Sequence, residues 1–154
     1  MSESCQNREA PVPGDVFECH LPVRWGDLDA VAHVNNTVYF RYAEEARAQL
    51  FEQVGMTVPS DVIPVLVHAS FDFLKPLFYP ATVSVILEFV RFGRSSLEFD
   101  VLVVSANQPD VLHARGKNIS VKAAVATGEA VAWTKAEKAA YAAAFTANKA
   151  RKTS

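Results

Sequence analysis

The stretch VRWGDLDAVAHVNNTVYFRYAEEAR, residues 23–47, combines a polar loop with the first turns of a helix. Its loop part, 25–36, contains a glycine, two aspartates and paired asparagines, which is a composition typical of an ordered turn. Asn35 or Asn36 is suited to cap the helix that follows. Apolar residues then recur at steps of three and four and predict an amphipathic helix over 37–54, which stops at a glycine.

Beyond this helix, apolar and polar residues alternate with a period of two. This pattern predicts antiparallel strands with one buried face. The predicted strands beyond the helix are 65–74, 83–89, 97–103 and 111–125. A further strand, 16–24, is predicted before the loop. A turn is predicted at Gln108-Pro109-Asp110, and the pair Thr134 and Glu137 forms a capping box that opens an alanine-rich helix to about Asn148. One early helix followed by antiparallel strands predicts an α+β domain whose sheet packs on that helix.

Length and composition describe one domain of ordinary globular character. The chain has 154 residues, of which 50% are hydrophobic and 21% charged. We expect a flexible leader over 1–15 and a single domain over 16–150. A net charge of −2 does not indicate binding to nucleic acid or to a membrane surface. The first residues lack a signal-peptide pattern, and no apolar run is long enough to span a bilayer, so we expect a cytoplasmic protein.

The segment 23–47 carries several motifs in a fixed register to the helix start. These motifs, which are Gly26-Asp-x-Asp29, His33-Val-Asn-Asn36, Tyr39 and the Glu-Glu-Ala-Arg sequence ending at Arg47, resemble the signature of the hotdog-fold acyl-CoA thioesterases of the 4-hydroxybenzoyl-CoA-thioesterase-like family. The resemblance extends over about 16–126. It implies a hotdog fold, in which a curved antiparallel sheet wraps around the central helix, here with an extra C-terminal helix.

The same resemblance implies an activity and an assembly. The implied reaction is hydrolysis of an acyl-CoA to the free acid and CoA, with no cofactor, because CoA is part of the substrate. The implied assembly is a homodimer with active sites at the subunit interface, often paired again into a homotetramer. Residues of the partner chain around 68–72 would then complete each site.

In this family the second aspartate of the pair is the catalytic carboxylate, which corresponds to Asp29. Thioester hydrolysis needs a nucleophile or a base that activates water, and a carboxylate beside a helix N-terminus stays ionised. A backbone N–H of the helix start, near Asn36, is expected to polarise the carbonyl oxygen. His33 and the Asn36 side chain are further catalytic candidates, with loop packing and capping as alternatives. For Asp27 we favour a bond to its own loop backbone.

The phosphates of CoA require cations, since arginine binds phosphate through two donors and lysine as a point charge. The candidates are Lys75, Arg91, Arg94, Arg115 and Lys117, with the hydroxyl of Ser95 in the turn between two strands. The alternative for each cation is a charged strand edge that resists aggregation. No metal is expected, because Asp27, Asp29 and His33 are not joined by a further Cys or His cluster.

Two other functions remain open within this fold. Hotdog hydratases typically carry a histidine five positions after the aspartate, whereas His33 is four positions after Asp29 and six after Asp27. The remaining alternative is an acyl-CoA-binding or regulatory module without turnover.

Overall fold

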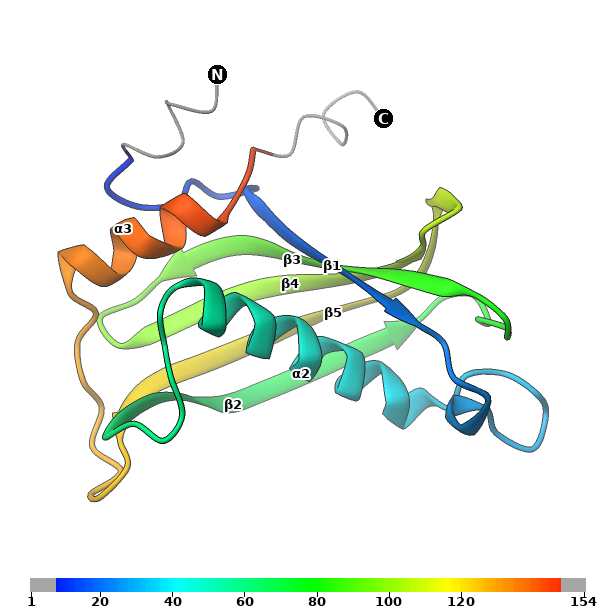
Figure 1. The fold of residues 1–154 in the computed structure, drawn as a ribbon, viewed down its shortest axis with the longest axis horizontal. Coiled ribbons are helices and arrows are strands. Elements are labelled where there is room, and N and C mark those ends of the chain that lie inside the picture. Colours follow the sequence, from blue (N-terminus) through cyan, green and yellow to red (C-terminus); the bar gives the residue numbers. More distant parts are fainter. Residues whose placement is uncertain (1–7, 148–154) are drawn as a thin grey trace.

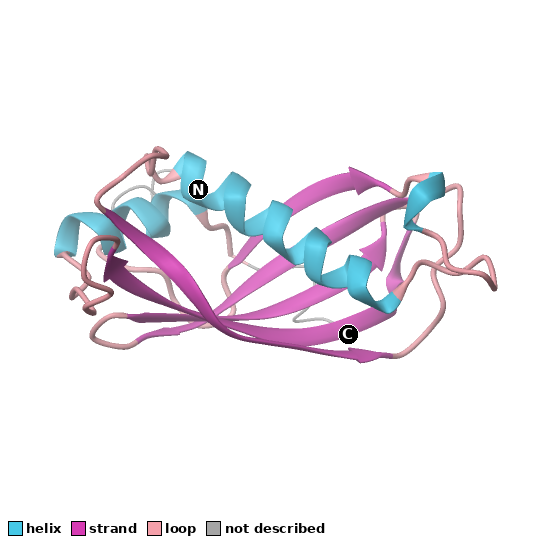
Figure 2. Cartoon of the chain, turned by 90° about the horizontal axis from the view of Figure 1, so that it is seen from below, coloured by secondary structure: helices cyan, strands magenta, loops and turns pink. Residues whose placement is uncertain are grey.

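The computed structural model describes residues 8–147. The elements in chain order are β1 (Val16–Pro22), the 3₁₀ turn η1 (Trp25–Asp27), α2 (Asn36–Gln53), β2 (Val62–Phe73), β3 (Thr82–Phe92), β4 (Ser96–Ser105), β5 (Gln108–Ala124) and α3 (Lys135–Ala144). The five strands form one antiparallel sheet in the order β1-β3-β4-β5-β2. The sheet curves around α2, while α3 lies at one end of it (Figures 1 and 2). The predicted α+β arrangement, including the extra C-terminal helix, is confirmed.

Helix α2 begins and ends where its sequence indicates. The side chain of Asn35 caps it by accepting a hydrogen bond from the Thr37 N–H at 2.9 Å. The chain leaves the helix at Gly55, whose φ of +85° favours glycine. The helix buries one face against the sheet, formed by Tyr39, Tyr42, Ala43, Ala46, Arg47 and Leu50. None of the described helices is long and apolar enough to cross a membrane.

The core lies between α2 and the inner face of the sheet. Alternate residues of β3 and β4 fill it, each 4% exposed or less, namely Val83, Val85, Leu87, Phe89, Leu97, Phe99, Val101 and Val103. The expectation of a single buried face fails for the central strands. On the outer face, Ile86, Leu102 and Val104 form a second small cluster, because the neighbouring side chains of Val16 and Leu112 cover them.

Most element boundaries differ from the sequence prediction by one to three residues, and two differences have a clear structural reason. The β4–β5 turn lies at 106–107 and not at 108–110, because the strand register shifts near Val104 and Gln108 already pairs with Ser105. Helix α3 ends at Ala144 and not near Asn148, which lies outside the described residues. It ends there because the next residue, Phe145, turns to an extended conformation and buries its ring completely.

Helix α3 is attached to the end of the sheet by a polar pair and an aromatic cluster. The predicted capping box of Thr134 and Glu137 is confirmed. Glu137 also accepts a hydrogen bond from the buried ammonium of Lys122 on β5. Burial alone would raise the pKa of the Glu137 carboxyl, but the bonds from Lys122 and Thr134 outweigh it and lower the pKa. Beside this pair, Phe92, Trp133, Tyr141 and Phe145 pack ring to ring or against Phe89 and Phe99.

The segment before β1 is not a free leader over its described part, 8–15. The Gly14 N–H donates to the carbonyl of Phe89 at 2.9 Å, and the Phe89 N–H donates to the carbonyl of Asp15 at 2.8 Å. The buried Asp15 carboxylate also accepts from the Arg8 guanidinium at 2.6 Å. These bonds attach the described part of the predicted leader to the sheet, and the rest of it, 1–7, lies outside the described residues.

Strand β5 approaches β2 so closely that only glycine fits at position 116. A Cβ on Gly116 would lie 1.8 Å from the carbonyl oxygen of Ser70 and 2.9 Å from the ring of Phe71. We therefore expect Gly116→Ala to lower the free energy of unfolding by about 3 kcal/mol through overpacking. Urea denaturation followed by circular dichroism measures it. In Gly26→Ala a Cβ meets nothing within 4 Å, so this control should stay within about 0.5 kcal/mol of the wild type; equal effects would contradict the close approach.

Candidate active site

The loop that joins β1 to α2 is a closed, hydrogen-bonded unit. Leu28 and Val34 form an isolated β-bridge across it. Inside the bridge, the Asp29 N–H donates to the carbonyl of His33 at 2.7 Å, and Ala32 adopts a left-handed conformation with φ of +61°. The loop is also tied to the segment before β3, since the Val34 N–H donates to the carbonyl of Leu77 at 2.9 Å. The ordered turn predicted from composition is confirmed.

The carboxylate of Asp29 is held by its own loop. Its Oδ1 accepts hydrogen bonds from the N–H groups of Val31 at 3.0 Å and His33 at 3.2 Å. Backbone bonding of this kind was the alternative to a catalytic role, and it is present. It leaves Oδ2 without a hydrogen-bond partner among residues 8–147, however, and the side chain is partly exposed. The two bonds therefore orient the carboxylate while one oxygen remains available.

Asp27 connects the loop to the helix. Its Oδ2 accepts from the Arg24 N–H at 2.9 Å, which confirms the predicted loop bond, and also from the Tyr42 hydroxyl at 2.8 Å. Its carbonyl accepts from the Asn35 N–H at 2.9 Å. Burial of Tyr42, together with its bond to Asp27, raises the pKa of the phenol, which stays a neutral donor. The position of Tyr42 was missed from the sequence, where it is one of several apolar-face residues of the helix.

The other two catalytic candidates are His33 and Asn36. The ring of His33 packs edge-on against Phe78, with centroids 5.0 Å apart, and contacts the Asp29 carboxylate through its backbone N–H only. Asn36 is exposed at the first position of α2, where Asn35 provides the cap. The Asn36 N–H makes no hydrogen bond within the part of the chain that the structure describes. Asp29, His33 and the start of α2 thus lie in one loop.

An aromatic surface lies between α2 and β2, beside the helix start. The rings of Phe40 and Phe71 are 5.1 Å apart, and those of Tyr39 and Phe73 are 5.2 Å apart. Phe40 is 39% and Phe73 43% exposed, so the surface is open on one side. We call these four residues the aromatic flank.

The middle of α2 carries a buried polar pair. The Arg47 guanidinium donates to the Oδ1 of Asn118 on β5, and both residues are buried. Burial lowers the pKa of the Arg47 guanidinium, although nearby Glu44 acts in the opposite direction. Arg47 ends the sequence motif around the helix, and its partner Asn118 could not be assigned from the sequence.

Comparison with known families identifies the chain. The family model described as the thioesterase-like superfamily matches residues 23–141, which includes the loop, α2 and the whole of β2 to β5. The chain belongs to the thioesterase-like superfamily. This thioesterase therefore has the hotdog fold that its motifs implied, and it is a thioester hydrolase.

Three similar proteins illustrate the range of the superfamily. A Pseudomonas aeruginosa protein proposed to be a thioesterase is 35% identical, with a TM-score of 0.78 over 82% of this chain and 98% of that one. A protein of Aquifex aeolicus (strain VF5) proposed to be an esterase is 29% identical over 64% of this chain and 86% of its own length. The 1,4-dihydroxy-2-naphthoyl-CoA thioesterase from Synechocystis is 20% identical, with a TM-score of 0.73 over 82% of this chain and 95% of that one, and shares the fold.

The predicted CoA-binding cations of the thioesterase are not brought together within one chain. Lys75 follows the end of β2 that pairs with Ala114. Arg94 and Ser95 lie at the opposite end of the sheet, where β4 starts beside Val121. These candidates therefore lie apart within a single chain, because the antiparallel strands place Lys75 and Arg94 at different ends of the sheet.

Three of these cations are also engaged in ion pairs. Arg91 lies 3.5 Å from Glu98, and Lys117 lies 2.8 Å from the same carboxylate. Arg115 lies 3.9 Å from Asp100. These ion pairs give each cation a structural partner, although β3 and β5 are inner strands and not the charged strand edge considered as the alternative. No group of three His, Cys, Asp or Glu side chains within residues 8–147 is placed to hold a metal ion.

Proposed function

We propose that this thioesterase hydrolyses acyl-CoA, with Asp29 as the catalytic carboxylate. The observation that carries the proposal is the pair of backbone bonds to Oδ1, which orients the side chain and leaves Oδ2 available. Preorganised groups of this kind lower the activation barrier because they need no rearrangement during the reaction. The carboxylate belongs to the loop that leads directly into the N-terminus of α2, whose dipole favours negative charge.

The Asn36 N–H is the proposed donor to the thioester oxygen. Of the first N–H groups of α2, those of Thr37 and Val38 are already bonded to Asn35, whereas that of Asn36 has no partner among the described residues. Negative charge that develops on the carbonyl oxygen during attack would be stabilised there, by about 3 kcal/mol for one such donor. Its exposed side chain remains a candidate to bind the attacking water.

Two chemical routes use the same residues. In the first, an Asp29 oxygen attacks the carbonyl carbon, the thiolate of CoA leaves and takes up a proton, and water then hydrolyses the mixed anhydride. In the second, Asp29 removes a proton from water, which attacks the carbonyl carbon directly; the C–S bond then breaks, and the departing thiolate of CoA takes up the proton from Asp29. We propose His33 as a positioning residue in both routes, because its backbone N–H bonds the carboxylate and its ring is fixed on Phe78.

The free edge of β2 supports an assembly of two chains. β2 is an outer strand of the sheet, and its middle residues, 65–68, are exposed, although they include Val65, Leu66 and Val67. Exposed apolar residues on a long edge strand invite pairing with another strand. We propose a homodimer in which β2 pairs with its copy, so that residues 68–72 of one chain lie near the aromatic flank of the other.

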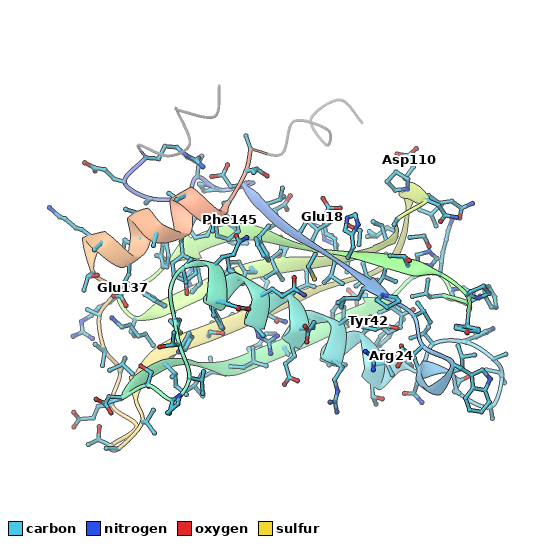
Figure 3. All side chains as sticks on the ribbon, viewed as in Figure 1. Glu18, Arg24, Tyr42, Asp110, Glu137 and Phe145 are labelled. Carbon is cyan, nitrogen blue, oxygen red and sulfur yellow. The ribbon has the colours of Figure 1, made fainter. Side chains whose placement is uncertain are left out.

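Removal of the Asp29 charge tests the catalytic assignment. Asp29→Asn keeps an oxygen that can accept the two backbone bonds, so we expect the fold to persist and kcat to fall by about 10²- to 10⁴-fold. The assay is thiol release from a panel of acyl-CoA substrates. Asp110→Asn, at an exposed carboxylate near the β4–β5 turn (Figure 3), is the matched control and should retain activity. Near-normal turnover by Asp29→Asn would refute the assignment.

Single turnover in heavy-oxygen water separates the two routes. If Asp29 attacks the thioester and water then cleaves the anhydride at the aspartyl carbonyl, the label enters the Asp29 carboxylate and not the product acid, and mass spectrometry of the loop peptide detects it. An unlabelled Asp29 with a labelled product acid would instead show that water attacks the acyl carbon, as the general-base route requires, and would argue against cleavage at an aspartyl carbonyl.

The same panel distinguishes the other functions of the fold. Hydration of an enoyl-CoA without thiol release would establish a hydratase, and tight binding without any turnover would establish a binding module. The superfamily assignment and the oriented Asp29 favour hydrolysis over both.

A charge on the β2 edge tests the dimer. In Val67→Lys the ammonium groups of the two copies would approach each other, so we expect the dimer dissociation constant to rise about tenfold or more, or 1.4 kcal/mol. Light scattering after size-exclusion chromatography at several concentrations measures it. Val12→Lys, at an exposed valine before β1, is the control and should leave the dimer intact. A wild-type monomer at all concentrations would exclude the proposed assembly.

A further inference from the structure

A cavity of about 590 Å³ lies between the end of β1 and the first half of α2. Leu21 and Pro22 of β1 form one wall, and Thr37, Arg41 and Tyr42 of α2 form the other. Arg24 and Asp27 close it on the side of the catalytic loop. Figure 3 shows Arg24 and Tyr42 at this N-terminal end of the helix. The cavity therefore adjoins the loop that carries Asp29, on the side of α2 away from the aromatic flank.

Two arginines of this cavity have no partner. Arg24 and Arg41 are exposed, and neither guanidinium forms an ion pair or a hydrogen bond within residues 8–147. By contrast, the guanidinium groups of Arg8, Arg47, Arg91 and Arg115 each contact an acidic or amide oxygen. Two uncompensated guanidinium groups that line one hollow can together bind an anion.

Two acidic residues, Asp27 and Glu45, also line the cavity, so the formal charges of its lining balance. The acceptors of these carboxylates are used elsewhere, however. Asp27 accepts two hydrogen bonds through Oδ2, from the Arg24 N–H and the Tyr42 hydroxyl, and Glu45 accepts from Gln49 at 3.4 Å. Neither carboxylate pairs with the guanidinium of Arg24 or Arg41 within residues 8–147, so both groups can donate to a bound anion.

We propose that this cavity binds the phosphate-bearing nucleotide end of acyl-CoA, with Arg24 and Arg41 as the phosphate ligands. The inference rests on the proposed function, since it names where that substrate binds. The flexible arm that joins the nucleotide to the thioester would run from the cavity along the loop 27–29 to the carboxylate.

The two ends of the substrate match the two flanks of α2. An acyl-CoA is apolar at the acyl end and polyanionic at the nucleotide end. The aromatic flank faces β2, and the cavity with the two arginines faces β1, which is the opposite edge of the sheet. The helix start and Asp29 lie between them. A substrate bound across the start of α2 would satisfy both flanks and bring its carbonyl to the Asn36 N–H.

Paired substrates test the site. With acyl-CoA, we expect Arg24→Ala and Arg41→Ala each to lower kcat/KM by about tenfold through a higher KM, which is the loss of one charge-assisted contact. With the S-acyl-pantetheine of the same acyl group, which lacks the nucleotide, the fall should be less than about twofold, since no contact is lost. Lys135→Ala removes one positive charge from exposed α3 and serves as the control for long-range electrostatics.

Calorimetry with adenosine 3′,5′-bisphosphate supplies a readout without turnover. The wild type should bind it, inorganic phosphate should bind far more weakly, and the double variant Arg24→Ala/Arg41→Ala should lose binding while keeping its thermal midpoint. Equal falls with both thioesters, no fall with acyl-CoA, or nucleotide binding by the double variant would overturn the inference and leave hydrolysis intact. If the wild type releases no thiol, the proposed function fails, and the calorimetry still decides the site.

Discussion

The hydrogen bond from the Tyr42 hydroxyl to the Asp27 carboxylate fixes the loop 25–36 on α2, and the rest of the candidate site depends on it. Tyr42 belongs to the buried face of the helix, so its position is set by the core. Asp27 in turn holds the loop in place, because it also accepts hydrogen bonds from the N–H groups of Arg24 and Asn35. The cap of α2 and the two-residue approach to Asp29 therefore share one partly buried anchor, Asp27.

The sheet stabilises the position of Tyr42, and so its hydrogen bond to Asp27, because the buried face of α2 packs against it. Gly116 lets β2 approach β5 closely, and Phe71 of β2 then packs against the aromatic rings of α2. The pair of Arg47 and Asn118 places a hydrogen bond in the same interface, where an unpaired guanidinium would be costly. A polar pair of fixed geometry restricts the rotation of the helix relative to β5 in a way that apolar contacts alone do not.

Much of the fold was predictable because its signals are local. The steps of three and four in α2, the period of two in the strands, the Asn35 cap and the capping box at Thr134 each involve residues close in sequence. The features that the sequence did not predict depend on contacts between residues far apart in the chain. The segment 8–15 looks flexible by composition, yet Gly14 and Asp15 pair with Phe89, which lies more than seventy residues away. Helix α3 stops early because the ring of Phe145 fills the distant core.

The candidate site shows the same division. Asp29 was assigned from a motif in register with the helix start, and the structure adds the two N–H groups that orient it. The CoA-binding cations were chosen by residue type alone. Without strand order, nothing in the sequence shows that Lys75 and Arg94 lie at opposite ends of the sheet, or that Arg24 and Arg41 line one hollow. Charged residues form a binding site only where the fold places them close together.

The two flanks of α2 would recognise different parts of the substrate, the nucleotide on one side and the acyl group on the other. The cavity that holds Arg24 and Arg41 is built from β1, the loop that follows it and α2 of one chain. The aromatic flank borders the free edge of β2, so its open side would be closed by a second chain in the proposed dimer. Recognition of the nucleotide would then be a property of the single chain, and the shape of the acyl pocket a property of the pair. Changes along β2 could alter acyl preference without disturbing either Asp29 or the phosphate ligands, because the start of α2 separates the two flanks.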